Sequence, residues 1–173
     1  MNIGEIHKKG DFIIVNGPAG FLAKCYGGCD YLTNLTVPDF TGYYSDKISL
    51  IDTNNIYLIS HVGFPHYGYV FKSEDVGNSW VALYDTTDFL FTDFMMFDTL
   101  NGFVLSTFYK SVMTNNDGAV WATGVHPLII TSASLKINDS TAIIGANRQV
   151  NNKLIMFRSN HSSVYIPTQP IAG

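Results

Sequence analysis

Positive charge is scarce in this sequence. Its 173 residues contain ten Lys and Arg together and 14 Asp and Glu, for a net charge of −4. Nucleic-acid binding needs clustered cations that neutralise phosphates, and the sequence has no such cluster. We therefore expect no nucleic-acid partner.

Long apolar runs are also missing. No stretch approaches the roughly 18 consecutive apolar residues of a membrane-spanning helix, so we expect no membrane span. Residues 1–11 carry Lys8 and Lys9 without an apolar segment behind them, and we expect no secretory signal there. Three options stay open: the chain remains inside the cell, leaves by another route such as virion assembly, or has a leader outside this sequence.

Cysteine is limited to Cys25 and Cys29, which flank a three-residue turn. Opposite arms of a hairpin can bring two Cβ atoms within disulfide range. Without a signal peptide we favour two reduced thiols and keep a disulfide as the alternative. A metal site would need two further ligands nearby, so we expect no metal.

Sequence signatures of common reactions are absent as well. Neither G-x-S-x-G nor H-E-x-x-H nor a phosphate-binding glycine loop occurs. We expect no cofactor and no catalytic residue on this basis.

The sequence is rich in β-strand signals. Runs of Val, Ile, Phe and Tyr are broken about every 8–12 residues by Gly, Asn, Asp or Pro. No segment shows a 3.6-residue apolar period with caps, and 46% hydrophobic with 14% charged residues fits a globular core. We predict an all-β chain with almost no helix.

One octet occurs twice, 41 residues apart, with the pattern hydroxyl-x-Asp/Asn-x-Gly-x-x-Trp. Its marked positions are Ser73, Asp75, Gly77 and Trp80 in the first copy, and Thr114, Asn116, Gly118 and Trp121 in the second. The hydroxyl should bond the local backbone, the Asp or Asn should accept from N–H groups two residues on, and the glycine should take positive φ. The tryptophan would open the next strand and seal the space between sheets. The octet is thus expected to be a structural turn.

Both octets resemble the Asp-box (BNR) repeat of sialidases, xyloglucanases and photosystem-assembly-factor-like repeat proteins. The resemblance implies four-stranded antiparallel blades around an axis, with the box between the third and fourth strands and away from the axial site. A repeat of about 40 residues is typical of such stacked units.

Two decayed copies extend the repeat to four units. We predict one β-propeller-like domain over residues 1–173, with four-stranded antiparallel blades at about 1–37, 44–87, 88–125 and 126–167. Four blades form a partial or small propeller. An arc would leave two sheet edges exposed, so we expect a longer polypeptide or an assembly with identical or different chains.

Sialidase chemistry is excluded for the isolated chain. The resemblance implies a carboxylate clamp of three arginines, and this sequence has only Arg148 and Arg158. A xyloglucanase-type site would need paired acids across a cleft in a much longer chain. We expect no enzyme activity.

Exposed aromatic residues are the candidates for binding. An insertion at 61–69 lengthens the second-to-third-strand hairpin of the second blade and contributes Phe64, His66, Tyr67 and Tyr69. Tyr43 and Tyr44, in the connector before that blade, are weaker candidates. Such rings suit protein or sugar contacts, and the alternative is that they pack on their own blade.

We therefore favour a non-catalytic scaffold or interaction module that binds proteins or copies of itself in a larger assembly. Its Asn-, Thr- and Tyr-rich, Arg-poor composition favours a virion or cell envelope over the cytoplasm. The alternative is a glycan-binding module, or a fragment of an Asp-box glycoside hydrolase.

Overall fold

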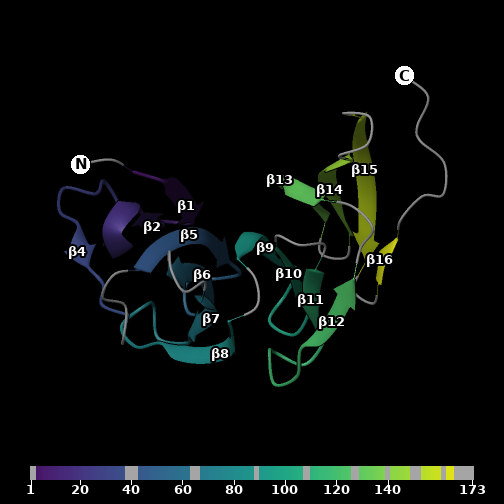
Figure 1. The fold of residues 1–173 in the computed structure, drawn as a ribbon. Helices are drawn as coiled ribbons and strands as arrows, with labels where there is room; N and C mark the ends of the chain where they lie inside the picture. The colour runs from purple at the N-terminus through teal and green to yellow at the C-terminus, as the bar shows by residue number, and fades with distance from the viewer. Residues whose placement is uncertain are drawn as a thin grey trace. The chain divides into compact units, whose positions relative to one another are not determined.

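The computed structural model describes residues 3–37, 43–62, 67–87, 90–106, 110–125, 129–138, 141–148, 153–160 and 163–165. These residues form four antiparallel four-stranded sheets (Figure 1). Within this described part, helix is limited to one short 3-10 turn, η1 (Pro18–Gly20). The predicted all-β fold class is confirmed. None of the described segments is a helix long and apolar enough to cross a membrane.

The chain divides into two compact units, Met1–Leu90 and Phe91–Gly173. The first unit contains two sheets, each in chain order. Sheet 1 consists of β1 (Glu5–Lys9), β2 (Phe12–Asn16), β3 (Leu22–Tyr26) and β4 (Thr33–Asn34). Sheet 2 consists of β5 (Tyr43–Leu50), β6 (Ile56–Val62), β7 (Tyr67–Ser73) and β8 (Val81–Thr86).

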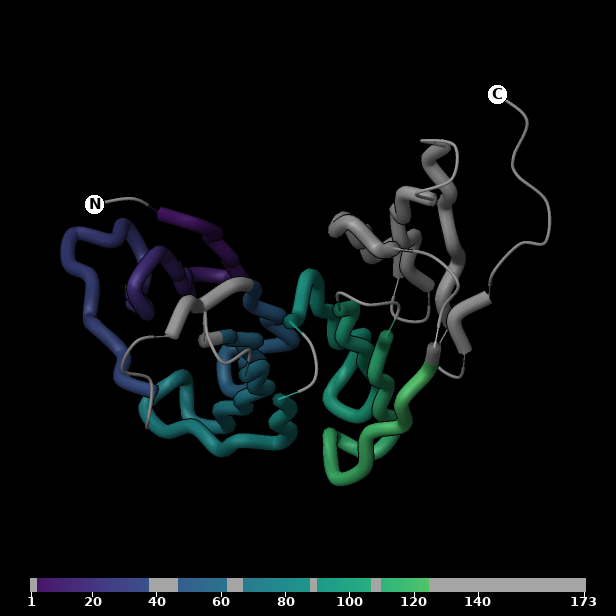
Figure 2. Tube along the Cα trace, in the orientation of Figure 1, coloured from purple at the N-terminus to yellow at the C-terminus, as the bar shows by residue number. Residues whose placement is uncertain are grey.

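The second unit repeats this arrangement. Sheet 3 consists of β9 (Phe91–Met96), β10 (Gly102–Ser106), β11 (Lys110–Thr114) and β12 (Ala122–Val125). Sheet 4 consists of β13 (Ile129–Asn138), β14 (Thr141–Arg148), β15 (Lys153–Asn160) and β16 (Ser163–Tyr165). Within each unit the chain completes one sheet before it enters the next, as Figure 2 shows for sheets 1 and 2. The predicted single domain and its blade boundaries stay predictions.

The second strand of each of the first three sheets is the most buried. Residues 56–60 of β6 and 102–106 of β10 are buried on every side chain, so both faces of these strands are covered. The fourth strands β4 and β8 are mainly exposed or half-buried. This gradient is typical of sheets stacked face to face, in which inner strands lose the alternation of buried and exposed residues.

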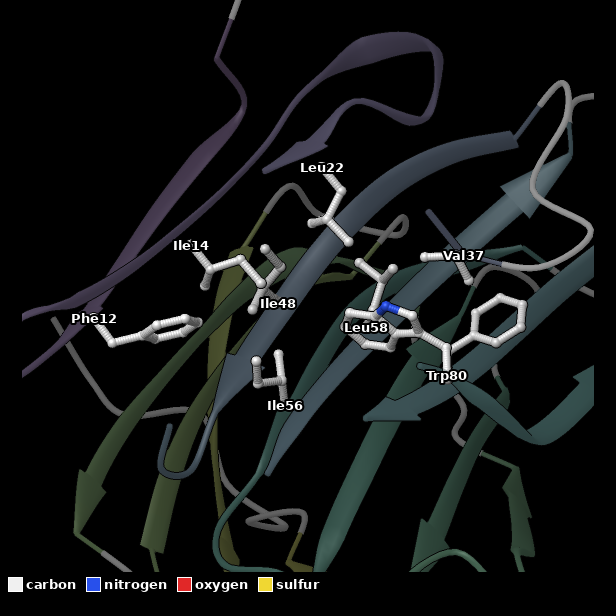
Figure 3. Close-up of a cluster of buried hydrophobic side chains, with 9 residues drawn as sticks. Phe12, Ile14, Leu22, Val37, Ile48, Ile56, Leu58 and Trp80 are labelled. Carbon is white, nitrogen blue, oxygen red and sulfur yellow. The ribbon is translucent and has the colours of Figure 1, made fainter. Parts of the chain in front are cut away.

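Sheets 1 and 2 share an apolar core. Phe12, Ile14 and Leu22 from sheet 1 lie against side chains from sheet 2, and Figure 3 shows both groups. The remaining members of the core are Val37, Ile48, Ile56, Leu58, Phe71 and Trp80. Each is at most 6% exposed. Because apolar burial contributes about 25 cal/mol per Å², this layer is the main source of stability in the first unit.

Tyr43 and Tyr44 do not lie in a connector as the sequence suggested. They are the first two residues of β5, where they pair with Val62 and His61 of β6. The sequence of residues 38–42, directly before them, contains Pro, Asp and Gly, which are turn signals. Strand pairing with β6 begins directly after them, so the signals end before Tyr43.

Candidate functional site

The first octet lies between β7, which ends at Ser73, and β8, which begins at Val81. Ser73 Oγ accepts hydrogen bonds from the Gly77 amide at 2.8 Å and the Asp75 amide at 3.3 Å, and donates to Asp75 Oδ1 at 2.9 Å. The Asp75 carboxylate in turn accepts from the Ser79 amide at 2.8 Å and from Ser79 Oγ at 2.6 Å. Both side chains are therefore used to close the turn.

Asp75 accepts from the amide of the fourth residue after it. The predicted donor two residues on was wrong, because the Gly77 amide bonds Ser73 Oγ. The turn contains two successive residues with positive φ, Val76 at 63° and Gly77 at 80°. They reverse the chain so that the Ser79 amide faces the carboxylate. The hydrogen bonds from the Ser79 hydroxyl and amide lower the pKa of Asp75 to about 2, against the opposing effect of burial.

The second octet repeats this network in the second unit, between β11 and β12. Thr114 Oγ1 accepts from the Gly118 amide at 2.9 Å and donates to Asn116 Oδ1 at 3.0 Å. Asn116 Oδ1 also accepts from the Val120 amide at 2.9 Å. An amide oxygen thus replaces the carboxylate of the first copy, which shows that the turn needs an acceptor rather than a charge.

The tryptophan of the first octet lies one residue before β8 and joins the two sheets. Trp80 is 6% exposed, belongs to the core with sheet 1, and donates from Nε1 to the Gly77 carbonyl oxygen at 3.0 Å. Gly77 is required at its position for two reasons. Its φ is positive, and an added Cβ would lie 2.8 Å from Leu35 Cδ1. In the second copy Trp121 is half-buried.

A second repeated turn precedes the second strand of sheets 2 and 3. Asp52 Oδ1 accepts from the amides of Asn54 and Asn55, each at 2.8 Å, and Asn55 Nδ2 donates to Asp52 Oδ2 at 2.9 Å. Asp98 and Asn101 form the same arrangement, with the Asn101 amide at 2.7 Å from Asp98 Oδ1. The carboxylates of these Asp-x-x-Asn turns also accept hydrogen bonds from residues of the same turn. Their role is therefore structural.

Sheet 1 has a disulfide where sheets 2 and 3 have the octet. Cys25 and Cys29 are bonded, with their Cα atoms 5.2 Å apart, so the preference for reduced thiols was wrong. Cys29 takes a left-handed φ of 56° in the turn that follows β3. Reduced thiols were expected because the sequence shows no signal peptide, but the turn itself brings the two cysteines within bonding distance.

Three polar contacts between sheets 1 and 2 were not foreseen from the sequence. Lys24, 8% exposed, donates from Nζ to the Val76 carbonyl oxygen at 2.8 Å and to Asn78 Oδ1 at 2.6 Å, both in the first octet. Lys9 Nζ bonds the Ile51 carbonyl oxygen beside the Asp52 turn. Burial lowers the pKa of Lys24, while the Asp75 charge opposes this effect. No pattern within a single strand indicates such contacts, because donor and acceptor are at least 42 residues apart.

The third contact is formed by Glu5, which accepts from Lys47 Nζ at 2.7 Å, the Ile48 amide at 3.2 Å and His7 Nε2 at 3.2 Å. Burial by itself would raise the pKa of Glu5. The hydrogen bonds from His7, Lys47 and Ile48 reverse that effect and lower the pKa to about 2.

The aromatic candidates fall into three groups. Phe64 and His66 lie outside the described residues. Tyr69 is half-buried, packs on the core and stacks on Phe71 with ring centroids 5.7 Å apart, so it belongs to its own sheet. Tyr67 is half-buried at the start of β7.

Strand register brings separate candidates together. Tyr43 pairs with Val62, and Val62 pairs with Tyr67, so the backbones of the two tyrosines flank β6 on either side. Tyr44 follows in the next pair, opposite His61. The first octet follows the other end of β7, so this aromatic end of sheet 2 and the octet turn lie at opposite ends of the sheet.

A shallow hollow in the second unit lies beside the second octet. It is lined by Met113, Thr114, Asn115, Val120, Ala122, Thr123 and Gly124. The Thr114 hydroxyl in this lining is engaged in closing the octet turn.

No protein-family model matches the sequence, and no curated protein matches it either. Several solved structures, however, are similar to this chain. The structure titled "YCF48 bound to D1 peptide" has a TM-score of 0.64 and 13% identity, covering 97% of this chain and 51% of that one. YCF48 from Cyanidioschyzon merolae has a TM-score of 0.64 and 11% identity, covering 92% and 50%.

A third structure, BamB from Moraxella catarrhalis, has a TM-score of 0.57 and 10% identity, covering 90% of this chain and 42% of that one. These proteins are β-propellers, and the chain has a β-propeller repeat fold. At such low identities the likeness shows the fold alone. The chain spans about half the length of the solved YCF48 chains that it matches.

Proposed function

We propose that this chain is a non-catalytic β-propeller module that binds protein partners within a larger assembly. The described polar side chains of the repeated motifs support this function, because Ser73, Asp75, Thr114 and Asn116 are all engaged in closing turns. Because the polar groups of these motifs bond the chain's own turns, they fit a scaffold that offers its surface to a binding partner better than a catalytic site. The finer identity we propose for the octets is the Asp-box, since they have its pattern and its position in the sheet.

The observation that carries the proposal is the aromatic end of sheet 2. Tyr43, Tyr44 and Tyr67 come from two strands and meet at one end of the sheet through strand register. Tyrosine supplies a large contact area at low entropic cost and is enriched in protein interfaces. One of the similar solved structures is titled "YCF48 bound to D1 peptide". This title supports a peptide as the ligand that we propose for this fold.

Selection from a displayed peptide library tests this function. The wild-type chain should enrich peptides, and Tyr67→Ser and Tyr43→Ser should each weaken binding of the enriched peptides by about tenfold, because an interface tyrosine commonly contributes more than about 1 kcal/mol. Tyr31→Ser is the matched control. Tyr31 is 89% exposed between β3 and β4 of sheet 1, and its loss should leave peptide binding unchanged.

Glycan binding is the alternative function. A glycan array with the wild type, His66→Ala and Tyr67→Ala distinguishes the two, since sugar rings stack on the same aromatic side chains. Binding of glycans that is lost in both variants, together with no enrichment of peptides, would replace the proposed function with glycan recognition or with a fragment of a glycoside hydrolase. A virion or cell-envelope assembly is the setting we propose for the module.

A further inference from the structure

Sheet 2 has an exposed carboxylate beside its tyrosines. Asp85 of β8 is the cross-strand partner of Tyr69 of β7, and cross-strand partners project from the same face of a sheet. Tyr67 lies two residues before Tyr69 on β7 and therefore shares this face. Both tyrosines are half-buried, whereas Asp85 is exposed. One face of sheet 2 thus carries two partly accessible aromatic rings next to a carboxylate in water.

The lysines of sheet 2 do not neutralise this carboxylate. The sheet contains Lys47 and Lys72, and each of them is held by a glutamate. Lys47 Nζ lies 2.7 Å from Glu5 Oε1, and Lys72 Nζ lies 2.6 Å from Glu74 Oε1. Among the residues that the structure describes, Asp85 forms no ion pair. Its charge is therefore left for a partner from outside.

The surrounding sequence increases the negative charge at this end of the sheet. Lys72 is the only Lys or Arg between residues 48 and 109. Asp46 occupies the extra position of a β-bulge in β5, two residues after Tyr44. Both edge strands of sheet 2 thus place an aspartate near the end where the tyrosines meet. Charge complementarity between partners speeds their association and rejects partners of the wrong sign.

Elsewhere in sheet 2 the same two kinds of group already hold a cation. Lys72 Nζ lies 5.6 Å from the centroid of the Tyr57 ring while it also bonds the Glu74 carboxylate. A tyrosine ring attracts an ammonium or guanidinium group through its quadrupole, and a carboxylate pairs with the charge directly. Asp85 and the half-buried ring of Tyr67 offer this combination to a cation that belongs to another molecule.

We propose that the peptide bound at the aromatic end of sheet 2 is cationic, with a Lys or Arg side chain that pairs with Asp85 and lies against Tyr67. The inference rests on the proposed peptide-binding function and names the chemistry of its ligand. The net charge of −4 on the whole sequence favours the same sign of partner at long range.

Selection from the displayed peptide library gives the first test. Peptides enriched by the wild-type chain should be richer in Lys and Arg than the unselected library, and poorer in Asp and Glu. Selection with Asp85→Lys should abolish this enrichment, because a cation then replaces the carboxylate. Asp85 is an exposed residue, so the variant should fold like the wild type, which circular dichroism checks.

Binding titrations with one enriched peptide locate the contact. Asp85→Asn should raise the dissociation constant about threefold, the loss typical of one exposed ion pair. The same peptide with norleucine in place of its lysine, or citrulline in place of its arginine, should lose a similar factor on the wild type and nothing further on Asp85→Asn.

Asp11→Asn is the matched control for these titrations. Asp11 is exposed in the turn between β1 and β2. This turn follows Lys9, which bonds the Ile51 carbonyl oxygen just beyond the end of β5 that is farthest from Tyr43. Removal of the Asp11 charge should therefore leave peptide binding unchanged.

The outcomes separate this inference from the function on which it rests. Enriched peptides without an excess of Lys and Arg overturn the inference, while the proposed peptide binding stands. The inference also fails if Asp85→Asn weakens binding no more than Asp11→Asn does, or if it weakens the uncharged peptide as much as the charged one. A selection that enriches no peptide at all overturns the proposed function and this inference together.

Discussion

At the scale of single residues, the hydroxyl and the Asp or Asn of each octet bond within the turn, the glycines take positive φ, and Trp80 of the first octet packs in the core. The sequence predicted the hydroxyl and the glycine correctly, since Ser73 and Thr114 bond local amides and Gly77 and Gly118 have φ of 80° and 77°. It did not predict Val76, a β-branched residue with φ of 63°. Positive φ is unfavourable for such a residue, so propensity alone argues against it, and only the closed hydrogen-bond network accounts for it.

Gly77→Ala should destabilise the chain more than Gly10→Ala does. Both glycines have positive φ, at 80° and 60°, but an added Cβ meets Leu35 at 2.8 Å in the first case and nothing within 4 Å in the second. We expect a loss of about 1 kcal/mol in unfolding free energy for Gly10→Ala from the backbone alone, and about 3 kcal/mol for Gly77→Ala with the added overlap. Urea unfolding measures both, and equal losses would show that Leu35 does not pack on the turn.

Stability should fall in acid as Glu5 becomes protonated. Its pKa is lowered from 4.5 to about 2 in the folded chain, so its contribution is complete above pH 4.5 and is lost as the pH falls toward 2. The contribution is on the order of 2 kcal/mol. Glu5→Gln should flatten the dependence of unfolding free energy on pH in this range, and Lys47→Gln should flatten it partly. An unchanged slope in Glu5→Gln would contradict the described contacts of this carboxylate.

At the scale of elements, the turn between the third and fourth strands is closed in different ways in different sheets. In sheets 2 and 3 the side chain of residue i accepts a hydrogen bond from the amide of residue i+4, as Asp75 does from Ser79. Sheet 1 uses a covalent bond over the same interval, between Cys25 and Cys29. The disulfide therefore acts as a substitute for the polar network of the octet.

Reduction of this disulfide should lower the stability of the first unit. Cross-linking a loop of about five residues restricts the unfolded chain by about 2 kcal/mol in the loop-entropy treatment. The melting temperature of the wild type should fall in the presence of a phosphine reductant, whereas that of the Cys25→Ser/Cys29→Ser double variant should not change. If the wild type melts at the same temperature in both conditions, the bond does not stabilise the fold.

The sequence predicted the sheets better than the positions of their surface residues. Alternating apolar runs and turn residues were sufficient to predict an all-β chain, because both signals are local, whereas the four-stranded antiparallel sheets were expected from the resemblance to the Asp-box repeat. Tyr43 and Tyr44 were assigned to a connector, and their meeting with Tyr67 was not predicted, because strand register depends on pairing between distant segments. For the same reason the contacts of Lys24 and Glu5 were not predicted. Lys24 donates to residues of sheet 2, and Glu5 accepts from residues of sheet 2.

At the scale of the whole molecule, two features of the described structure support the proposed role in protein binding. Its acidic residues at the described turns are engaged with neighbouring amides, and its core is formed by sheets that stack through apolar faces. Among the described residues, the aromatic end of sheet 2 is the proposed site for a peptide.

The central claim is that the repeated octets are turns closed by their own side chains and that they join stacked sheets. Residue-resolved hydrogen exchange by NMR tests it most directly, through the amides of Gly77, Ser79, Gly118 and Val120, which donate to octet side chains. Ser79 and Val120 are exposed residues, so protection of their amides can come only from these bonds. We predict slow exchange at all four amides, with loss of protection at Ser79 in Asp75→Ala. Exchange at the rate of an unstructured chain at these four positions would contradict the account.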